Sequence, residues 1–383
     1  MSLFLVTYFF VYGLLQLYLF LKARAACHFG LGAGIAVGGF MVVMMATPVA
    51  VRLMDRQGAM IPARGLAYLG YTWMGLIFLL FCLSLCVDFY NLAMRLLAVL
   101  TGSPTARLLL TGRKAFLTLV LLGLALGLWA TAEAWRIRLE HLEITSDKLP
   151  PHLHQLKVAQ ISDLHLGLIV GERRLERVLS LIREAEPDLL VCTGDLVDAQ
   201  MDHLNHLASL LAQVKPPLGK FAVLGNHEFY AGIEQSERFL TLAGFTILRG
   251  TRDLPGGLFA VVGVDDPVAL YRQSGSRTPD EQEAEALAAP GSRPFTLLLK
   301  HRPSVRTESL GQYDLQLSGH THKGQIFPFT LITRLWFPRQ DGFYRLAGGS
   351  LLYVSRGTGT WGPPMRFLAP PEVTLITVTR TGG

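Results

Sequence analysis

Apolar residues are distributed unevenly along this chain of 383 residues. Ahead of residue 136 they form four continuous runs, at residues 3–21, about 30–53, about 66–87 and 115–134. Each run approaches the ~20 residues that a helix needs to cross the hydrocarbon core of a bilayer. The pattern predicts a membrane region with four transmembrane helices in residues 1–135, although four buried helices of a globular protein would show similar runs.

Beyond a predicted linker at residues 136–154, short apolar runs alternate with amphipathic segments. Residues 171–186 carry apolar side chains at helical spacing, so we expect a helix with one buried face that ends at Pro187. Residues 267–294 are mostly polar, with a helix start at 278–281, and predict a surface excursion. Strands are expected at residues 156–161, 188–192, 221–224, 295–299, 315–317, 351–355 and 373–379. Residues 155–383 therefore predict a single α/β domain.

Composition agrees with this division. Half of the residues are hydrophobic and the mean hydropathy is +0.36, which is high for a soluble protein. The formal charge of +6 and the pI near 9.2 could indicate nucleic-acid binding, but the basic residues are scattered and form no stripe with interleaved aromatics. Lipid head groups are the simpler partner for these charges, so we expect a lipid bilayer as partner and no nucleic acid.

Loop charges favour one orientation of the membrane region by a small margin. The first and third loops carry six basic residues, namely Lys22, Arg24, Arg95, Arg107, Arg113 and Lys114. Five others lie around the second loop and after the fourth run, namely Arg52, Arg56, Arg64, Arg136 and Arg138. The positive-inside rule then places the first and third loops in the cytoplasm, and the domain after the fourth span outside it.

Five short polar blocks each follow an apolar run in the second part of the chain. They supply the carboxylate, imidazole and amide groups that two hard divalent ions require from loops at strand ends. One such block is a common turn, but five in one chain predict a two-metal phosphoesterase. The blocks are Asp163-Leu164-His165, Gly194-Asp195-Leu196-Val197-Asp198, Gly225-Asn226-His227-Glu228, Lys300-His301 and Gly319-His320-Thr321-His322.

Spacing within the blocks suggests how the side chains converge. Asp163 and His165 are two residues apart, so an extended backbone would point both to one side while Leu164 faces the core. His320 and His322 have the same spacing, which would let one loop reach two ions.

The order of the blocks resembles that of the calcineurin-like metallophosphoesterase superfamily over residues 155–380. The apolar amino-terminal part, the Ser318–His322 ending and Pro370-Pro371-Glu372 are similar to one bacterial branch of membrane-anchored phosphodiesterases, related to the enzymes that cleave UDP-2,3-diacylglucosamine. The resemblance implies a β-sandwich of two mixed sheets flanked by helices, held in the bacterial inner (plasma) membrane. Lys323 departs from the two glycines usual after the last histidine, so local loop shape and substrate choice need not follow that branch.

The resemblance also assigns roles. It implies that Asp163, His165, Asp195 and His322 hold one divalent ion, and that Asp195, Asn226, His301 and His320 hold the other. Mn²⁺ is the expected metal, and Fe or Zn²⁺ would suit the same mixture of oxygen and nitrogen donors.

His227 has a different implied role, because it follows the ligand Asn226 and would face the phosphate. In the family the matching histidine is the general acid that protonates the leaving oxygen after attack by a metal-bridging hydroxide, or it stabilises the charged transition state. By the same motif, Asp198 orients its ring. General-acid catalysis typically contributes ~10²–10⁴-fold. Glu228 and Thr321 are expected to support the ligand loops, and Asp265 and Asp266 to form a turn or to position substrate.

The resulting hypothesis is a membrane-anchored phosphohydrolase that cleaves a phosphodiester or pyrophosphate bond, with a lipid-linked substrate favoured by the anchor. A general or nucleotide phosphodiesterase is the alternative, followed by a sensor that binds metal and phosphate without turnover. Residues 331–344 and 358–367 could form an amphipathic rim that dips into the membrane interface and receives an acyl-bearing substrate, and ordinary core and loop packing explains them equally well. Nearly uncharged spans argue against transport, and the sequence predicts no particular oligomeric state.

Overall fold

A computed structural model describes residues 2–102, 105–198, 204–273, 275, 277–288 and 293–381, except for the side chains of residues 2–4 and 106. These residues divide into two units. The first contains the residues up to Ala132 together with Gly362–Met365. The second contains the residues from Glu133 to Trp361 and from Arg366 onward. Residue 1 and residues 382–383, at the ends of the two predicted domains, lie outside the described residues.

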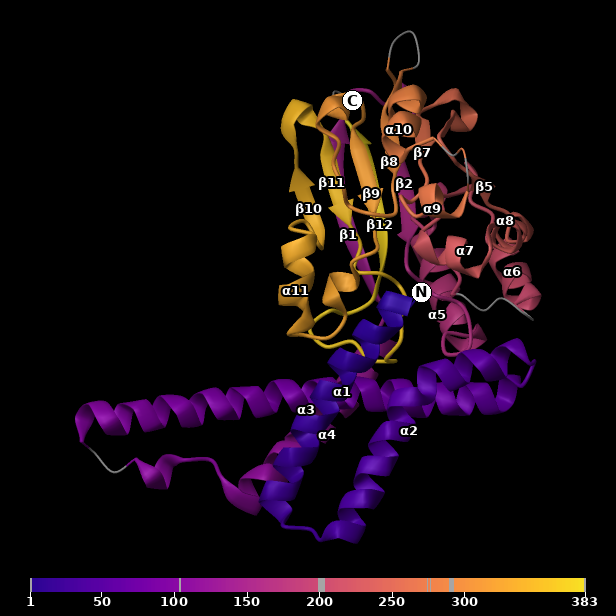
Figure 1. The fold of residues 1–383 in the computed structure, drawn as a ribbon. Helices are drawn as coiled ribbons and strands as arrows, with labels where there is room; N and C mark the ends of the chain where they lie inside the picture. Colours follow the sequence, from indigo (N-terminus) through magenta and orange to yellow (C-terminus); the bar gives the residue numbers. More distant parts are fainter. Residues whose placement is uncertain are drawn as a thin grey trace. The chain divides into compact units, whose positions relative to one another are not determined.

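Four long apolar helices make up most of the first unit: α1 (Ser2–Cys27), α2 (Leu31–Arg56), α3 (Met60–Thr101) and α4 (Gly112–Trp135) (Figure 1). All four are long and apolar enough to cross a membrane. They confirm the four predicted segments, but α3, with 42 residues, extends beyond both ends of the predicted run at 66–87. Between α1 and α3, Lys22 pairs with Asp88, and the hydroxyl of Tyr18 donates to the same carboxylate at 2.6 Å.

Two six-stranded sheets organise the second unit. The first has the order β1-β12-β2-β3-β4-β5 and the second β10-β11-β9-β8-β7-β6. Strands β2 to β5 are mutually parallel, as are β7, β8, β9 and β11, while β12 runs antiparallel to β2. The strands are β1 (Arg138–Ser146), β2 (Gln155–Ile161), β3 (Leu189–Cys192), β4 (Lys220–Ala222), β5 (Thr246–Ile247), β6 (Thr251–Asp253), β7 (Ala260–Gly263), β8 (Thr296–Leu299), β9 (Leu315–Ser318), β10 (Gly342–Arg345), β11 (Leu351–Val354) and β12 (Glu372–Arg380).

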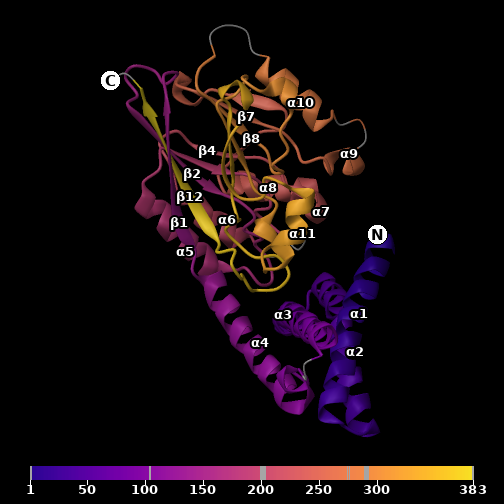
Figure 2. The same cartoon turned by 90° about the vertical axis from the view of Figure 1, so that its left-hand side faces the viewer.

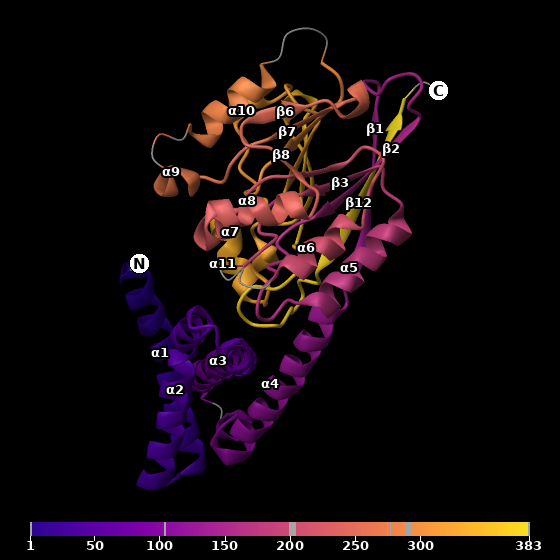
Figure 3. The same cartoon turned by 90° about the vertical axis from the view of Figure 1, so that its right-hand side faces the viewer.

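Helices follow several of these strands. They are α5 (Glu172–Ala185), α6 (Asn205–Ala212), α7 (Asn226–Ala231), α8 (Ile233–Leu242), α9 (Ala269–Arg272), α10 (Pro279–Leu287) and α11 (Phe329–Trp336). Figure 3 shows α5, α6 and α8 on one side of the first sheet. The two mixed sheets and their helices confirm the predicted fold class.

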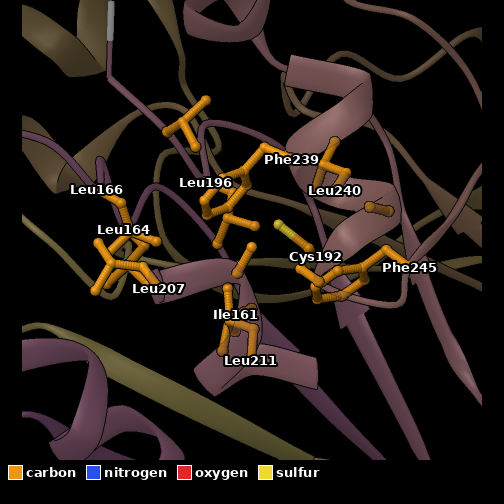
Figure 4. Close-up of a cluster of buried hydrophobic side chains, with 14 of the residues drawn as sticks. Ile161, Leu164, Leu166, Cys192, Leu196, Leu207, Leu211, Phe239, Leu240 and Phe245 are labelled. Atoms are coloured by element: carbon orange, nitrogen blue, oxygen red, sulfur yellow. The ribbon is translucent and has the colours of Figure 1, made fainter. Parts of the chain in front are cut away.

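Alternation along the strands explains how the first sheet is buried on both faces. In β3, Leu189 and Val191 join a core with residues of the second sheet such as Leu297 and Leu315. Their neighbours Leu190 and Cys192 join the core under the helices. Figure 4 shows this helix-side core, with side chains of Cys192, Leu207, Leu211, Phe239 and Leu240 gathered together. Successive side chains of a strand point to opposite faces, so a strand between two layers is apolar throughout.

The predicted linker at 136–154 instead contains strand β1. Figure 2 shows β1 beside β12, and the two pair in parallel from Arg138 with Glu372 to Ser146 with Arg380. The error has a physical cause, because an edge strand with one exposed face contains many charged residues and reads as polar. Leu142 and Ile144 nevertheless pack into the core between the sheets.

The prediction that residues 267–294 form a surface excursion is wrong for α10, which packs against the second sheet. Its start is as expected, with Pro279 in the first turn and Thr278 as the N-cap that accepts from the N–H of Glu281 at 3.1 Å. Ala286 and Leu287, however, pack with Val262 of β7, so α10 covers the second sheet. Residues 274, 276 and 289–292 of this segment lie outside the described residues.

Replacement of a buried residue of α5 should destabilise the second unit. Ile182 is fully buried in the helix-side core, so Ile182→Ala should lower the free energy of unfolding by about 2–5 kcal/mol. Pulse proteolysis in urea of the detergent-solubilised chain would measure the loss. Arg183→Ala, at the exposed next position, is the control and should change stability by less than about 0.5 kcal/mol. Equal stability of the two variants would contradict the burial of this helix face.

Candidate metal centre

The polar blocks all follow carboxyl ends of parallel strands. Asp163 and His165 come after β2, Asp195 after β3, and Asn226 and His227 begin α7 after β4. In the second sheet His301 follows β8, and His320 and His322 follow β9. Parallel strands present their carboxyl ends at one edge of a sheet, so each sheet contributes one group of loops to the site.

The backbone at these positions is left-handed rather than extended. Five of the predicted ligands have positive φ: Asp163 (52°), His165 (54°), Asp195 (52°), His320 (72°) and His322 (48°). The expectation of an extended backbone for the Asp163 block is therefore wrong. Such a conformation costs roughly 1 kcal/mol or more for a non-glycine residue and is typical of functional sites.

Hydrogen bonds between loops hold the first two blocks in this conformation. The N–H of Asp163 donates to the carbonyl of Gly194 at 3.0 Å, and the N–H of His165 donates to the carbonyl of Asp195 at 3.0 Å. Gly194 also lets its loop approach the loop of the third block closely, because a Cβ at this position would lie 2.7 Å from the backbone nitrogen of Gly225. The turns, and not strand alternation, direct the Asp163 and His165 side chains into the site.

The predicted ligands form two groups of donor atoms. In one, Nε2 of His165 lies 3.1 Å from Nε2 of His322, which is 3.6 Å from Oδ1 of Asp163. The donor atoms of these three residues lie within 4.8 Å of one another.

The second group contains Asp195, Asn226, His301 and His320. Nε2 of His301 lies 3.2 Å from Oδ2 of Asp195, 3.2 Å from Oδ1 of Asn226 and 3.0 Å from Nδ1 of His320. Asp195 also approaches the first group, with Oδ2 at 3.9 Å from Nε2 of His165. The structure thus brings together all seven predicted ligands, with Asp195 between the two groups.

Burial perturbs the ionisation of these side chains. Burial raises the pKa of Asp163 to about 6 against the opposing charge of His301, and burial together with the charge of His227 lowers the pKa of His165 to about 3. For His301 burial acts downward, but the charge of Asp195 and their contact raise the pKa to about 10. Burial also lowers the pKa values of His320 and His322 well below the usual range.

This donor set fits divalent cations. Imidazole nitrogens that face each other at 3.0–3.1 Å, as in His165–His322 and His301–His320, repel each other unless a proton or a cation lies between them. Buried carboxylates likewise need a compensating positive charge. Mixed carboxylate, amide and imidazole donors suit Mn²⁺, Fe or Zn²⁺. The clusters indicate a dinuclear divalent-metal site.

Glu228 supports the Asp195 loop, as the sequence predicted. Its fully buried carboxylate accepts hydrogen bonds from the N–H groups of Asp195 (2.9 Å), Leu196 (2.8 Å), Val197 (3.2 Å) and Gly225 (2.8 Å). One side chain thereby fixes both the Asp195 and the Asn226 loops. Thr321 has a comparable role, because its hydroxyl donates to the carbonyl of Gln340 at 2.5 Å.

His227 lies against the predicted metal ligands and pairs with Asp198. Nδ1 of His227 is 3.0 Å from Oδ1 of Asp198, and its backbone N–H donates to Oδ1 of Asp195 at 2.8 Å. Burial lowers its pKa, but the charge of Asp195 and the bond to Asp198 outweigh burial and raise the pKa to about 9. A ring nitrogen of His227 also lies within 4.8 Å of donor atoms of His165 and Asp195.

Aromatic residues of the predicted rim reach this cluster. The ring of Trp361 lies 5.6 Å from that of His227, and the ring of Phe337 lies 5.2 Å from that of His320. Trp361 is half exposed. One segment of the rim therefore borders the predicted catalytic residue His227, and the other borders the predicted ligand His320.

Arg366 is a site residue that the sequence did not reveal. It is fully buried, and its Nη2 lies 2.9 Å from Nδ1 of His322. Its guanidinium also donates to the carbonyls of Gly359, Arg356 and His322. The residue stands alone among loop residues, so neither spacing nor a motif could have indicated it.

Asp265, Asp266 and Lys323 use their charges in ion pairs within the fold. Asp265 and Asp266 are buried and pair with Arg249 and Arg302, at 2.9 Å and 2.7 Å, so their charges are used within the fold. Lys323, the departure from glycine, has a φ of 52° and pairs with Asp341 at 2.9 Å. A lysine therefore takes the left-handed conformation that a glycine would adopt there.

Comparison with known proteins agrees with this geometry. The profile of the calcineurin-like phosphoesterases matches residues 156–324. An uncharacterized metallophosphoesterase of Aquifex aeolicus is 42% identical over 67% of this chain and 97% of its own length. A zebrafish (Danio rerio) transmembrane protein with a metallophosphoesterase domain is 35% identical over 61% of this chain and 56% of its own. A Campylobacter jejuni metallophosphoesterase is 30% identical over 81% of this chain and 82% of its own.

The fold and the site define a metal-dependent phosphoesterase. The chain belongs to the calcineurin-like metallophosphoesterase family. Its four apolar helices and its similarity to proteins named as transmembrane indicate a membrane protein. The narrower resemblance to the enzymes that cleave UDP-2,3-diacylglucosamine stays a prediction.

Glu228→Gln should weaken metal binding by about 10–100-fold. The amide NH₂ would face backbone N–H groups that now donate to a carboxylate oxygen, so the Asp195 and Asn226 loops would shift. Calorimetric titration of the metal-free chain with Mn²⁺ would measure the change. Glu176→Gln, the same change at an exposed position of α5, is the control. Unaltered affinity in Glu228→Gln would show that these loops do not depend on this carboxylate.

Proposed function

We propose that this chain is a membrane-anchored phosphohydrolase that uses two divalent ions to cleave a phosphodiester or pyrophosphate bond. Asp163, His165, Asp195 and His322 would hold one ion, and Asp195, Asn226, His301 and His320 the other. The observation that carries the proposal is the position of Asp195 between two groups of donor atoms, with the His227–Asp198 pair alongside. Mn²⁺ is the favoured metal, and Fe or Zn²⁺ would also fit.

Metal ions in such a site lower the pKa of a bound water and neutralise phosphoryl oxygens. The remaining chemistry falls to side chains of the chain itself. His227 is protonated at neutral pH when its pKa is about 9, so it can give a proton to the leaving oxygen. Asp198 keeps the ring in place through Nδ1, which leaves Nε2 as the atom that donates.

The membrane location of the enzyme supports the proposal of a lipid-linked substrate. Four candidate membrane spans place the chain in a bilayer, where lipids are concentrated and already oriented. Trp361 and Phe337 border the site and could accept an apolar part of the substrate. We place the protein in a bacterial inner membrane, with the catalytic domain on the extracytoplasmic side. A general or nucleotide phosphodiesterase is the second candidate, and a non-catalytic sensor the third.

The substrate class can be tested with the detergent-purified chain and Mn²⁺. Hydrolysis of UDP-2,3-diacylglucosamine would be measured beside hydrolysis of bis-p-nitrophenyl phosphate, and we expect strong preference for the lipid. Turnover of the simple diester alone would favour the general phosphodiesterase. Turnover of neither, with metals bound, would favour the sensor.

Two variants separate catalysis from metal binding in this assay. His227→Ala should retain both metals while turnover falls by about 10²–10⁴-fold. Asp195→Ala should lose both metals, because each group of donors shares that carboxylate. Metal content by mass spectrometry and turnover would be measured together. Near-normal turnover in His227→Ala would refute its role as the acid.

Asp198→Asn should change the pH dependence of kcat/KM. The carboxylate of Asp198 raises the pKa of His227, so its loss should lower that pKa. Because the acid must be protonated, activity declines as pH rises through this pKa, and the decline should move by about one unit to lower pH. Asp198→Glu keeps the charge and is the control. If kcat/KM of Asp198→Asn declined over the same alkaline pH range as that of the unsubstituted chain, the His227–Asp198 pair would have no role in catalysis.

A further inference from the structure

Helix α11 turns its apolar face outward and its polar face toward the protein, the reverse of what is usual for a surface helix of a soluble domain. Its large apolar side chains are exposed, and its threonines face inward. Thr333 is only 9% exposed, and the hydroxyl of Thr330 donates to the carbonyl of Lys323 at 2.8 Å. The exposed residues, here termed the α11 face, are Phe329 (46%), Leu331 (58%), Ile332 (48%), Leu335 (82%) and Trp336 (79%).

The spacing of these residues makes one continuous stripe. Leu331, Ile332, Leu335 and Trp336 recur at intervals of one, three and four residues, which places them on one side of a helix. Thr330 and Thr333 follow the same helical period on the other side. A contiguous apolar patch of this kind, rimmed by polar residues, is typical of a surface that contacts a protein or a membrane.

The neighbouring segment extends the exposed apolar surface. Backbone bonds of 3.0 Å join Phe327 to Phe367 and Phe367 to Gln325, just ahead of α11. The Gln325 side chain exchanges hydrogen bonds of 2.9 Å with the backbone of Trp361. Trp361 is 50% exposed, and Leu368, next to Phe367, is 54% exposed. The segment before α11 is thus hydrogen-bonded to Trp361, the aromatic residue that lies beside His227.

Charge around the α11 face suits an anionic surface. Residues 329–345 contain Arg334, Arg339 and Arg345, all exposed, against one acidic residue, Asp341. That aspartate already pairs with Lys323 at 2.9 Å. Arginines beside exposed Trp and Leu side chains are the composition of helices that lie in the head-group region of a membrane.

The connection between α4 and β1 is short, which keeps the second unit close to the membrane. Helix α4, a candidate membrane span, ends at Trp135, and β1 begins at Arg138. Arg136 and Ile137 alone connect them, and so short a segment reaches about 10 Å at most when extended. The second unit is therefore tethered within a short distance of the lipid surface, which makes a bilayer the occupant that we consider for the α11 face.

We propose that the α11 face inserts into the boundary between head groups and acyl chains of the bilayer. Its apolar side chains leave water there while Arg334, Arg339 and Arg345 contact anionic head groups. This docking goes beyond the proposed function, because a domain docked in this way could act on a soluble or on a lipid phosphate. It also gives the reversed faces of α11 a physical reason.

The experiment uses a spin label on the full chain in phosphatidylglycerol-containing vesicles. Cys27, Cys82 and Cys86 are replaced by alanine, and Cys192, which is fully buried, is kept. A label at Leu335→Cys is compared with one at Tyr271→Cys, an apolar residue of α9 that is 86% exposed. We expect collisions with oxygen, relative to a water-soluble nickel complex, to be several-fold more frequent at position 335.

Equal collision ratios at positions 335 and 271 would overturn the proposal. A label at Ile332→Cys, on the same face, repeats the measurement in case the first variant is misfolded. Spin–spin broadening that disappears when labelled protein is diluted with unlabelled chain would mean that a second copy covers the face, and would also overturn it. Absence of lipid hydrolysis, by contrast, would count against the lipid-linked substrate of the proposed function and leave these collision ratios to decide on docking.

Discussion

The structure of the catalytic unit depends on burying several negative charges where the two sheets meet. Asp163, Asp195 and Glu228 are almost completely inaccessible to water. Glu228 is compensated by four backbone N–H groups, and Asp163 accepts from the N–H of His320 at 3.0 Å. Asp195 lies 3.2 Å from Nε2 of His301 and faces the other imidazoles. Divalent ions bound by the same imidazoles would compensate its negative charge. Charges this deeply buried are stable only in a fixed arrangement of donors and counter-charges.

That requirement explains why the strained loops lie on a rigid framework. Left-handed turns at Asp163, His165 and Asp195 are unfavourable by themselves, and they persist because the surrounding fold specifies them. The strands just before them are buried on both faces, between the helix-side core and the core between the sheets. A ligand loop can then move very little, which favours a catalytic site with fixed geometry.

The membrane places a second constraint on the same unit. A two-residue connection after α4 leaves no room for the linker that the sequence indicated, because β1 is already part of the first sheet. The exposed apolar side chains of α11 and the half-exposed Trp361 would be unfavourable on a freely soluble domain. The catalytic unit thus combines a rigid metal site with an apolar border that suits a position beside the membrane.

The sequence by itself predicted the membrane segments, seven of the twelve described strands and the side chains that gather at the strand ends, because long apolar runs and strand-end blocks are local patterns. It also indicated His227 and its partner Asp198. Tertiary structure decided what depends on distant neighbours. Strand β1 needs β12, some 230 residues away, to be recognised. The left-handed turns need loops from neighbouring strands, and Arg366 becomes a partner of His322 only when its loop is buried. The outward face of α11 was one of two possibilities that its sequence left open, since the same amphipathic pattern usually faces a core.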